Sequence, residues 1–239
     1  NAGGRTCSAP YADQAVAGSS FLALKAGKEK DTGIIAAQKA ACVKALTAKK
    51  MSSSLKKIGK KFDTTKPVYR NAMLSTQGAF AMNTGTVAAR VKFPATRGMH
   101  GGIWLQSVDG SEIDFIESFG YGRGLTSVIH VDGQRYPGEG GDVYVNTDAV
   151  KDRNWWKQYH VYSVEWDREQ VVFRVDGTET QRITQSTPDV DYFVVVSMLS
   201  SDWEQKRFNN PVKNADGVTP TKLPQSMSVD WVKIWAPAA

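Results

Sequence analysis

Cysteine and histidine are scarce in this sequence, and they form no metal-binding motif. The 239 residues include two cysteines and three histidines, with no C-x-x-C pair and no Cys/His cluster. Structural zinc sites use four such ligands at short, regular spacings. The sequence therefore argues against a structural zinc site, and no residue set in it indicates a metal or cofactor that the chemistry would require.

The two cysteines, Cys7 and Cys42, both lie near the N-terminus. A disulfide between them would close a loop of about 36 residues, which in the chain-entropy model stabilises a fold by roughly 3 to 4 kcal/mol. A single disulfide fits an exported protein, and two free thiols are the alternative.

The sequence also lacks a hydrophobic run long enough to span a membrane, and its start, NAGGRTCSAP, lacks a charged-then-apolar signal region. We therefore expect no membrane partner and a processed or trimmed N-terminal end, and the possible disulfide leads us to expect a secreted protein. With 41% apolar and 10% aromatic residues, residues 1–239 suffice for one large all-β domain. Nothing indicates an obligate assembly, so we expect a monomer.

Basic residues are concentrated in a segment that has few aromatic side chains. The formal net charge is +6, yet residues 25–66 hold twelve lysines against three acids, whereas residues 67–239 hold 17 basic and 20 acidic residues. A nucleic-acid interface interleaves basic and aromatic side chains on its working face, so no nucleic-acid partner is expected. We interpret the lysines as a solvated face, with binding of an anionic wall polymer as the alternative.

The chain divides into a divergent N-terminal segment, residues 1–66, and a more regular core, residues 67–239. In the first part, FLALK predicts a strand, apolar residues from Thr32 onward recur at helical spacing, and residues 51–67 read as a loop. From Tyr69, short runs with period-2 alternation are broken by Gly, Pro and Asn. This second pattern is typical of an antiparallel β-sandwich.

One stretch, GSEIDFIESFGYG, places three carboxylates in a run that otherwise resembles a buried strand. Side chains alternate along a strand, so Glu112 and Asp114 share one face and Glu117 would point to the other. A β-bulge at Phe115 or Ile116 corrects the parity and brings all three acids to one face. A generic match of this spacing is more often a strand with one polar side.

The bulged spacing is suited to covalent glycoside cleavage. It places the Cα atoms of Glu112 and Glu117 roughly 13 Å apart, and two glutamates that lean together close much of that distance. We expect a carboxyl separation nearer the roughly 5 to 5.5 Å of retaining glycosidases than the roughly 6.5 to 9.5 Å of inverting ones. Asp114 would split their ionisation, so that one glutamate stays charged and attacks while the other is held protonated and donates.

At these residues the sequence resembles the family 16 glycoside hydrolases, retaining endo-acting enzymes on a β-jelly-roll with a concave substrate cleft. The bulged ExDxxE motif is similar to their laminarinase-like branch. The resemblance implies that Glu112 is the nucleophile, Glu117 the acid/base residue and Asp114 an assisting residue. It also raises the question of a structural calcium ion, which family members often carry and which the sequence alone does not establish.

The resemblance extends over Tyr69 to Trp235, with several motifs in the family's order. These are ARVKFP, a tryptophan strand, the three acids, H-x-Y-x-x-E-W, V-D-G and the closing SMSVDWVKIW. One departure lies in the turn expected before the tryptophan strand. The family often has Trp-Pro there, whereas this chain has Met99 and His100 followed by two glycines, which alters the expected floor of the cleft.

Sugar rings stack on flat indoles and are bound by polar groups at their hydroxyls. Trp104, eight residues before the first acid, is expected to be a stacking platform, and Asn71 resembles a family residue that contacts the sugar. His130 is expected either to be structural or to orient Glu117 or a sugar hydroxyl. The predicted substrate-binding residues are Trp104, Asn71, His130, Trp203 and His100, and the tryptophans interpreted as packing are Trp166, Trp231 and Trp235.

Together these features predict a secreted endo-acting hydrolase that cleaves a β-linked polysaccharide with retention, β-1,3-glucan in the first place. The same fold could instead act on a galactan, a mixed-linkage glucan or a bacterial wall polysaccharide, or transfer glycosyl groups to sugars. A jelly-roll that only binds carbohydrate is a further alternative. The two intact glutamates argue against it, because a lectin has no need of three acids in a buried strand.

Overall fold

The computed structural model describes residues 8–47, 68–96, 99–120, 125–131, 134–137, 155–184, 187–200 and 225–236. Most of their regular structure is β-strand. The elements are β1 (Ala9–Pro10), η1 (Ala12–Gln14), β2 (Ala15–Ala17), β3 (Leu22–Lys28), α1 (Thr32–Thr47), β4 (Tyr69–Ser75), β5 (Gly85–Lys92), β6 (Met99–Ser107), β7 (Glu112–Ser118), β8 (Leu125–Val131), β9 (Gln134–Pro137), η2 (Trp155–Lys157), β10 (His160–Trp166), β11 (Val171–Val175), β12 (Thr178–Ile183), β13 (Tyr192–Ser200) and β14 (Gln225–Trp235).

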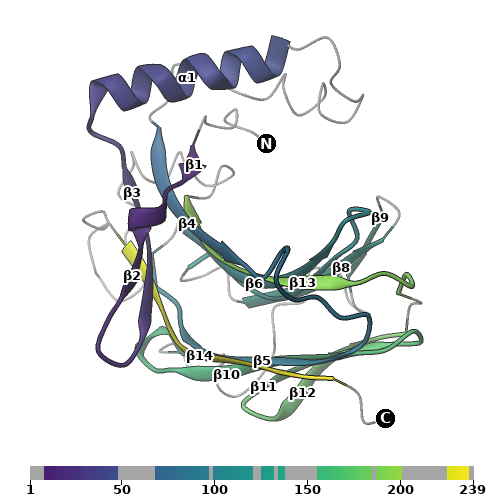
Figure 1. The fold of residues 1–239 in the computed structure, drawn as a ribbon. Coiled ribbons are helices and arrows are strands. Elements are labelled where there is room, and N and C mark those ends of the chain that lie inside the picture. The colour runs from purple at the N-terminus through teal and green to yellow at the C-terminus, as the bar shows by residue number, and fades with distance from the viewer. Residues whose placement is uncertain are drawn as a thin grey trace.

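The strands form two stacked layers (Figure 1). The first layer follows the order β4-β13-β6-β7-β8-β9 and the second the order β12-β11-β10-β5-β14-β3. Neighbours within each layer are antiparallel. A short pairing of β3 with β4 joins the layers into one folded sheet. The architecture confirms the predicted β-jelly-roll sandwich.

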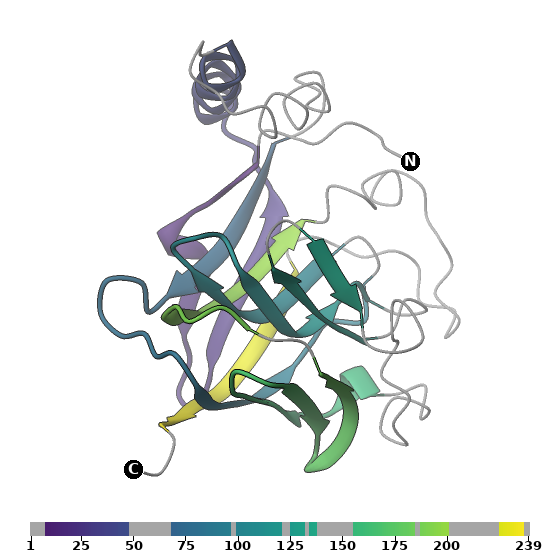
Figure 2. The same cartoon turned by 90° about the vertical axis from the view of Figure 1, so that its right-hand side faces the viewer.

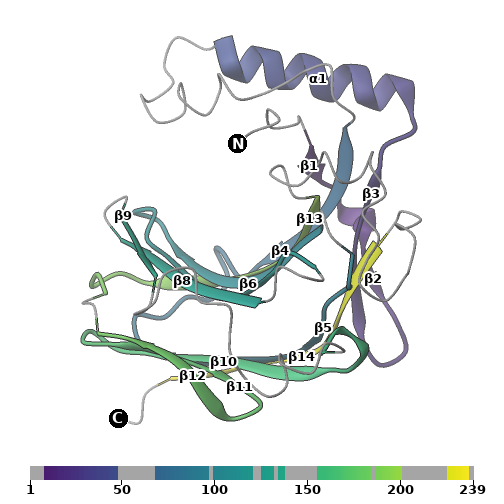
Figure 3. The ribbon, with the colours of Figure 1, turned by 180° about the vertical axis from the view of Figure 1, so that it is seen from behind.

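Strand alternation builds the hydrophobic core between the layers. Val87, Ala89 and Val91 of β5 are fully buried, and they belong to the same cluster as Ile103 and Leu105 of β6. The side chains that alternate with these on β6 therefore point away from the second layer. The first layer is curved, and its concave side is turned away from the second layer and toward α1 (Figures 1 and 3).

The N-terminal segment contributes more to the sandwich than its sequence indicates. The strand predicted at FLALK is confirmed as β3, which pairs with β14 over five residues, and Figure 2 shows the two strands side by side. Its Leu24 and Ala26 are completely buried. The apolar pattern of β3 is weak in the sequence because lysines and small residues follow its two leucines.

The helix predicted from Thr32 onward is confirmed as α1. The Asp31 carboxylate accepts hydrogen bonds from the backbone N–H groups of Gly33 and Ile34, which caps the first turn. In the part of α1 whose side chains are described, none is fully buried. No helix in the described ranges is both long and apolar enough to cross a bilayer.

Several sequence predictions fall outside the described ranges. Cys7 and the loop expected at residues 51–67 are among them. The disulfide between Cys7 and Cys42 therefore stays a prediction.

The second layer carries the turns that the sequence indicated. The β11–β12 hairpin turns at Asp176 and Gly177, whose φ angles are 49° and 81°; Asp and Gly are residues that tolerate this left-handed region. Trp166 is buried, as predicted, but Trp235 is 48% exposed. The packing role predicted for Trp235 is wrong, because it pairs with Thr86 on the face of β5 opposite the buried Val87.

Candidate active site

Phe115 is the extra residue of a β-bulge in β7. Ile103 of β6 pairs with Ile116, and its neighbour Trp104 pairs with Asp114, so the register passes over Phe115. The pairing with β8 shifts at the same place. The Ser127 hydroxyl of β8 donates a hydrogen bond of 2.9 Å to the Phe115 carbonyl oxygen, so the bulge leaves this backbone group satisfied.

The bulge places all three acids on one face of the first layer. Across β6 they lie opposite Gln106, Trp104 and Gly102, which alternate with the buried Ile103 and Leu105. Side chains directly opposite each other in a sheet share a face. The acids therefore point away from the core, on the concave side of the layer, as the sequence predicted.

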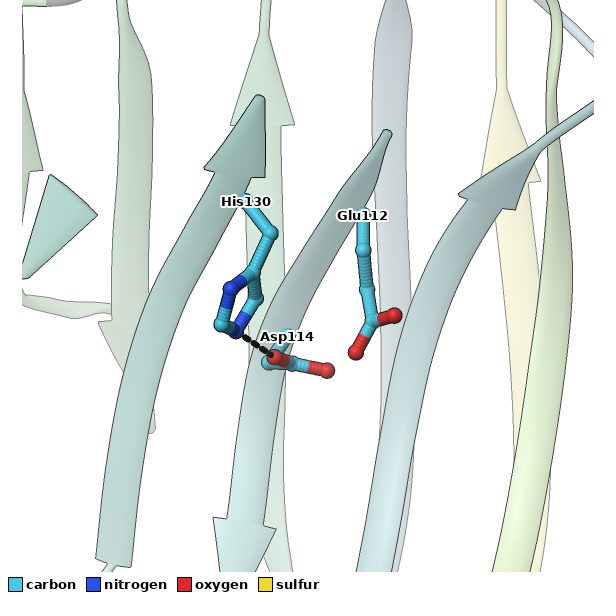
Figure 4. A group of neighbouring side chains, drawn as sticks. All are labelled: Glu112, Asp114 and His130. Carbon is cyan, nitrogen blue, oxygen red and sulfur yellow. Dashed lines mark ion pairs between the residues drawn. The ribbon is translucent and has the colours of Figure 1, made fainter. Parts of the chain in front are cut away.

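Asp114 lies between Glu112 and His130 (Figure 4). Its side chain is only 6% exposed, and its Oδ2 lies 3.3 Å from Nε2 of His130. A buried carboxylate is costly without a partner, and the imidazole supplies one. His130 was predicted to be structural or to orient Glu117 or a sugar hydroxyl. The structure places it against Asp114 because its position on β8 is opposite Glu112.

The same three side chains are also the one group of acids and histidines in the described ranges that is close enough to hold a metal ion. One ligand atom from each of Glu112, Asp114 and His130 lies within 4.8 Å of the others. His130 also contacts Asp114 within this group, and the expectation that the chemistry needs no metal stays a prediction.

Both carboxylate oxygens of Glu117 have partners on neighbouring strands. Oε1 lies 2.6 Å from Nε2 of His100 on β6, and Oε2 accepts a 3.1 Å hydrogen bond from the Thr126 hydroxyl on β8. The Glu117 side chain is 15% exposed. Contacts from both sides hold this carboxyl group in one plane.

These contacts set the ionisation of Glu117. Burial raises the pKa of its carboxyl, but the hydrogen bond and charge of His100, the Thr126 hydroxyl and the charge of His130 together hold the pKa below its usual value. Glu117 is therefore ionised near neutral pH in the free protein. The sequence did not reveal the contact of Glu117 with His100, and the prediction that one glutamate is held protonated for the reaction stays a prediction.

His100 belongs to strand β6 and not to a turn, which corrects the sequence prediction. The following residue, Gly101, lies so close to Phe93 that a Cβ atom there would be 2.7 Å from the ring. This glycine lets β6 continue against the core where a turn was expected. The His100 ring stacks on Phe119, with ring centroids 4.5 Å apart and planes 23° apart.

Trp104 and Asn71 lie on the acid-bearing face. Trp104 is half-buried beside Asp114, and its indole N–H donates to the Ser197 hydroxyl at 3.3 Å. Asn71 alternates on β4 with the buried Ala72, and its side-chain oxygen accepts the Ser200 backbone N–H at 2.9 Å. Their predicted contacts with sugar stay predictions, and Trp203 lies outside the described ranges.

Thr126 and Phe119 are site residues that the sequence analysis missed. Thr126 is four residues before His130 on β8, so strand alternation alone would have placed it on the same face. Phe119 follows Glu117 by two residues, just after β7 ends. No sequence signal distinguishes it from a core phenylalanine.

Comparison with known proteins gives one family. The family model for the glycosyl hydrolases family 16 matches residues 30–233. A β-glucanase of Rhodothermus marinus is 22% identical over 193 residues, which are 70% of this chain and 62% of that protein. A glucan endo-1,3-β-glucosidase A1 of Niallia circulans is 25% identical over 193 residues, which are 70% of this chain and 26% of that protein.

The chain thus spans less than two thirds of these relatives. Among solved structures, the laminarinase catalytic domain of Thermotoga maritima superposes with a TM-score of 0.62 at 17% identity, covering 100% of this chain and 85% of that one. At this identity the superposition supports the fold alone.

Proposed function

The chain belongs to family 16 of the glycosyl hydrolases, and from this premise we propose that it is a retaining, endo-acting glycoside hydrolase that cleaves a β-linked polysaccharide. The observation that carries the proposal is the bulge in β7, which brings Glu112, Asp114 and Glu117 to one concave face. Most glycoside hydrolases use two carboxyl groups that flank the bond to be cleaved.

The two glutamates take different roles because their surroundings differ. Glu117, which must first take up a proton when substrate binds, transfers it to the departing glycosidic oxygen. The Glu112 carboxylate attacks the anomeric carbon at the same time, which forms a glycosyl-enzyme and releases one half of the polymer. Glu117, now a carboxylate, then removes a proton from water, and the resulting attack on the anomeric carbon frees Glu112.

Asp114 and His130 support the nucleophile. Asp114 is buried beside Glu112, and its Oδ2 lies 3.3 Å from Nε2 of His130. Two unpaired carboxylates at this distance would repel each other and resist ionising together. We propose that the imidazole reduces this repulsion by its contact with Asp114 and that no metal or cofactor takes part.

The leading substrate is β-1,3-glucan. Trp104 presents a half-buried indole beside Asp114, which suits the apolar C–H face of a sugar ring. The curated relatives are named as a β-glucanase and an endo-1,3-β-glucosidase. Secretion fits an enzyme whose substrate is an insoluble or extracellular polymer, and we propose an extracellular monomer.

One observation is consistent with a different polysaccharide substrate or with a sugar as the glycosyl acceptor. His100 lies against Glu117 at the position where the family often has tryptophan, so the surface next to the acid differs from the common family pattern. A different polymer, such as a galactan or a mixed-linkage glucan, or transfer to a sugar acceptor would each use the same two glutamates.

Incubation with laminarin, lichenan and agarose-type galactan separates these outcomes. Reducing ends and product lengths are followed over time, with and without EDTA, and Glu112→Gln is the inactive control. We expect rapid shortening of laminarin that EDTA does not affect. Products longer than the substrate indicate transfer, cleavage of another polymer alone corrects the substrate, and binding without cleavage refutes the proposal.

A further inference from the structure

Resting on the proposed function, we propose that His100 is a positioning residue that shares a single proton with Glu117, so that the two side chains supply the acid of the reaction as a unit. His100 need not touch the polysaccharide for this role. It acts through Glu117, and it lies in the stretch where the family often has Trp-Pro.

The contact between the two side chains is short and sheltered. Nε2 of His100 lies 2.6 Å from Oε1 of Glu117, and the side chains are 23% and 15% exposed. Stacking on Phe119 holds the imidazole ring in place, and the Thr126 hydroxyl holds the other carboxylate oxygen. A contact of this length between a partly buried imidazole and a partly buried carboxyl group is the geometry of a shared proton.

No other described group around Glu117 is placed to share a proton with it. On its own strand Glu112 and Asp114 are acids that cannot donate to a carboxylate when ionised, and His130 of β8 is engaged with Asp114. From β13 the nearest side chain on this face is that of Ser197, which does not titrate. In the described part of the site, His100 is thus the one titratable donor in hydrogen-bond contact with Glu117.

The proton balance of the unit follows the two steps of the reaction. Before cleavage the pair holds one proton, placed on Nε2 when water reaches the site. When a neutral polysaccharide displaces that water, separated charges become less favourable, and the proton moves from Nε2 to the Glu117 carboxyl. Glu117 gives it to the glycosidic oxygen, which leaves the pair without a proton until the carboxylate takes one from the attacking water.

This arrangement determines how activity falls at high pH. In the wild-type protein, activity falls at high pH only when the His100–Glu117 pair loses its one shared proton. When His100 is replaced by a side chain that cannot ionise, activity falls as soon as Glu117 alone loses its proton. Two groups that share a proton hold it more tightly than either does alone, so the replacement moves the alkaline loss of activity to lower pH.

The test is the pH dependence of kcat/KM for the polysaccharide in wild-type protein and His100→Asn. We expect the alkaline limb to move to lower pH by about one unit, which is about a tenfold loss on that limb, with a smaller change at acidic pH. His160→Asn is the matched control, because His160 pairs with Asp176 in the second layer, and its profile should match that of the wild type.

Two results would overturn the inference. If the alkaline limb of His100→Asn stays at the wild-type pH, His100 is structural. If the limb moves to higher pH, His100 only lowers the pKa of Glu117 and does not share its proton. His100→Ala with added imidazole tests whether a lost limb reflects misfolding. We expect imidazole to restore the alkaline limb of this variant. If imidazole fails to do so in a protein with a normal circular dichroism spectrum, the inference is also contradicted. A wild-type protein inactive on every polysaccharide would instead refute the proposed function.

Discussion

At the scale of single residues, the proposed chemistry depends on one carboxyl group that side chains of two neighbouring strands contact from both sides. Oε1 of Glu117 faces His100 and Oε2 faces Thr126. Because β6 and β8 provide these contacts, we expect the carboxyl to keep one orientation through the proposed proton donation and proton removal. Pre-oriented acids of this kind lower the barrier without reorganising during the reaction.

We therefore expect Glu117→Gln to lower kcat on polysaccharide by about 10²- to 10⁴-fold, the usual contribution of a positioned general acid. Initial rates of reducing-end release measure this. Glu165→Gln is the matched control, because Glu165 pairs with Arg174 on the exposed side of the second layer, and its rate should equal that of the wild type. A loss below tenfold in Glu117→Gln would remove Glu117 from the acid role.

At the scale of single elements, β6 positions the site by running unusually close to the core. Gly101 and Gly102 are adjacent, but a Cβ atom on Gly101 would lie 2.7 Å from the Phe93 ring, whereas one on Gly102 would meet nothing closer than 3.7 Å. Phe93 is only 2% exposed, so it cannot move aside into solvent. The tight approach on one side of β6 supports the strand that carries His100 and Trp104 on the other.

Gly101→Ala should therefore lower the free energy of unfolding by about 1 to 3 kcal/mol, the usual cost of overpacking a core, and Gly102→Ala should change it much less. Chemical denaturation followed by tryptophan fluorescence compares the two variants. Equal stability of both would show that β6 is not held at this distance from Phe93.

The same element scale shows what the sequence could and could not predict. Strand alternation and three acids at an odd spacing were enough to predict the bulge near Phe115, since only an extra residue brings Glu117 to the face of Glu112. The contact between His100 and Glu117 was not predictable, because it depends on the register between β6 and β7. No local pattern in either strand fixes that register.

At the scale of the whole molecule, the two layers are joined where β3 meets β4, and Glu29 lies at that junction. Its carboxylate accepts the backbone N–H groups of Asp31 and Lys30 and bonds to Arg70 of β4 at 2.6 Å. Glu29 is only 5% exposed. The sequence did not predict this role, because the acids of the lysine-rich segment carry no pattern that separates a junction from a solvated loop.

The backbone hydrogen bond from Asp31 and the charge of Arg70 outweigh burial and hold the pKa of Glu29 below its usual value. A lowered folded-state pKa stabilises the fold above the unfolded value of about 4.3, and the benefit is lost as the pH falls through the folded pKa. Glu29→Gln should thus lower the melting temperature at pH 7, and the difference from wild type should shrink toward pH 3. A difference of equal size at both pH values would contradict this role.

The central claim is that Glu112 attacks the sugar and Glu117 serves first as acid and then as base. The most direct test is proton NMR of the anomeric signals during the first minutes of laminarin cleavage. We predict that the new reducing ends appear as the β-anomer and only later equilibrate with the α-anomer, because two inversions at one carbon restore its configuration. Initial formation of the α-anomer would contradict the account.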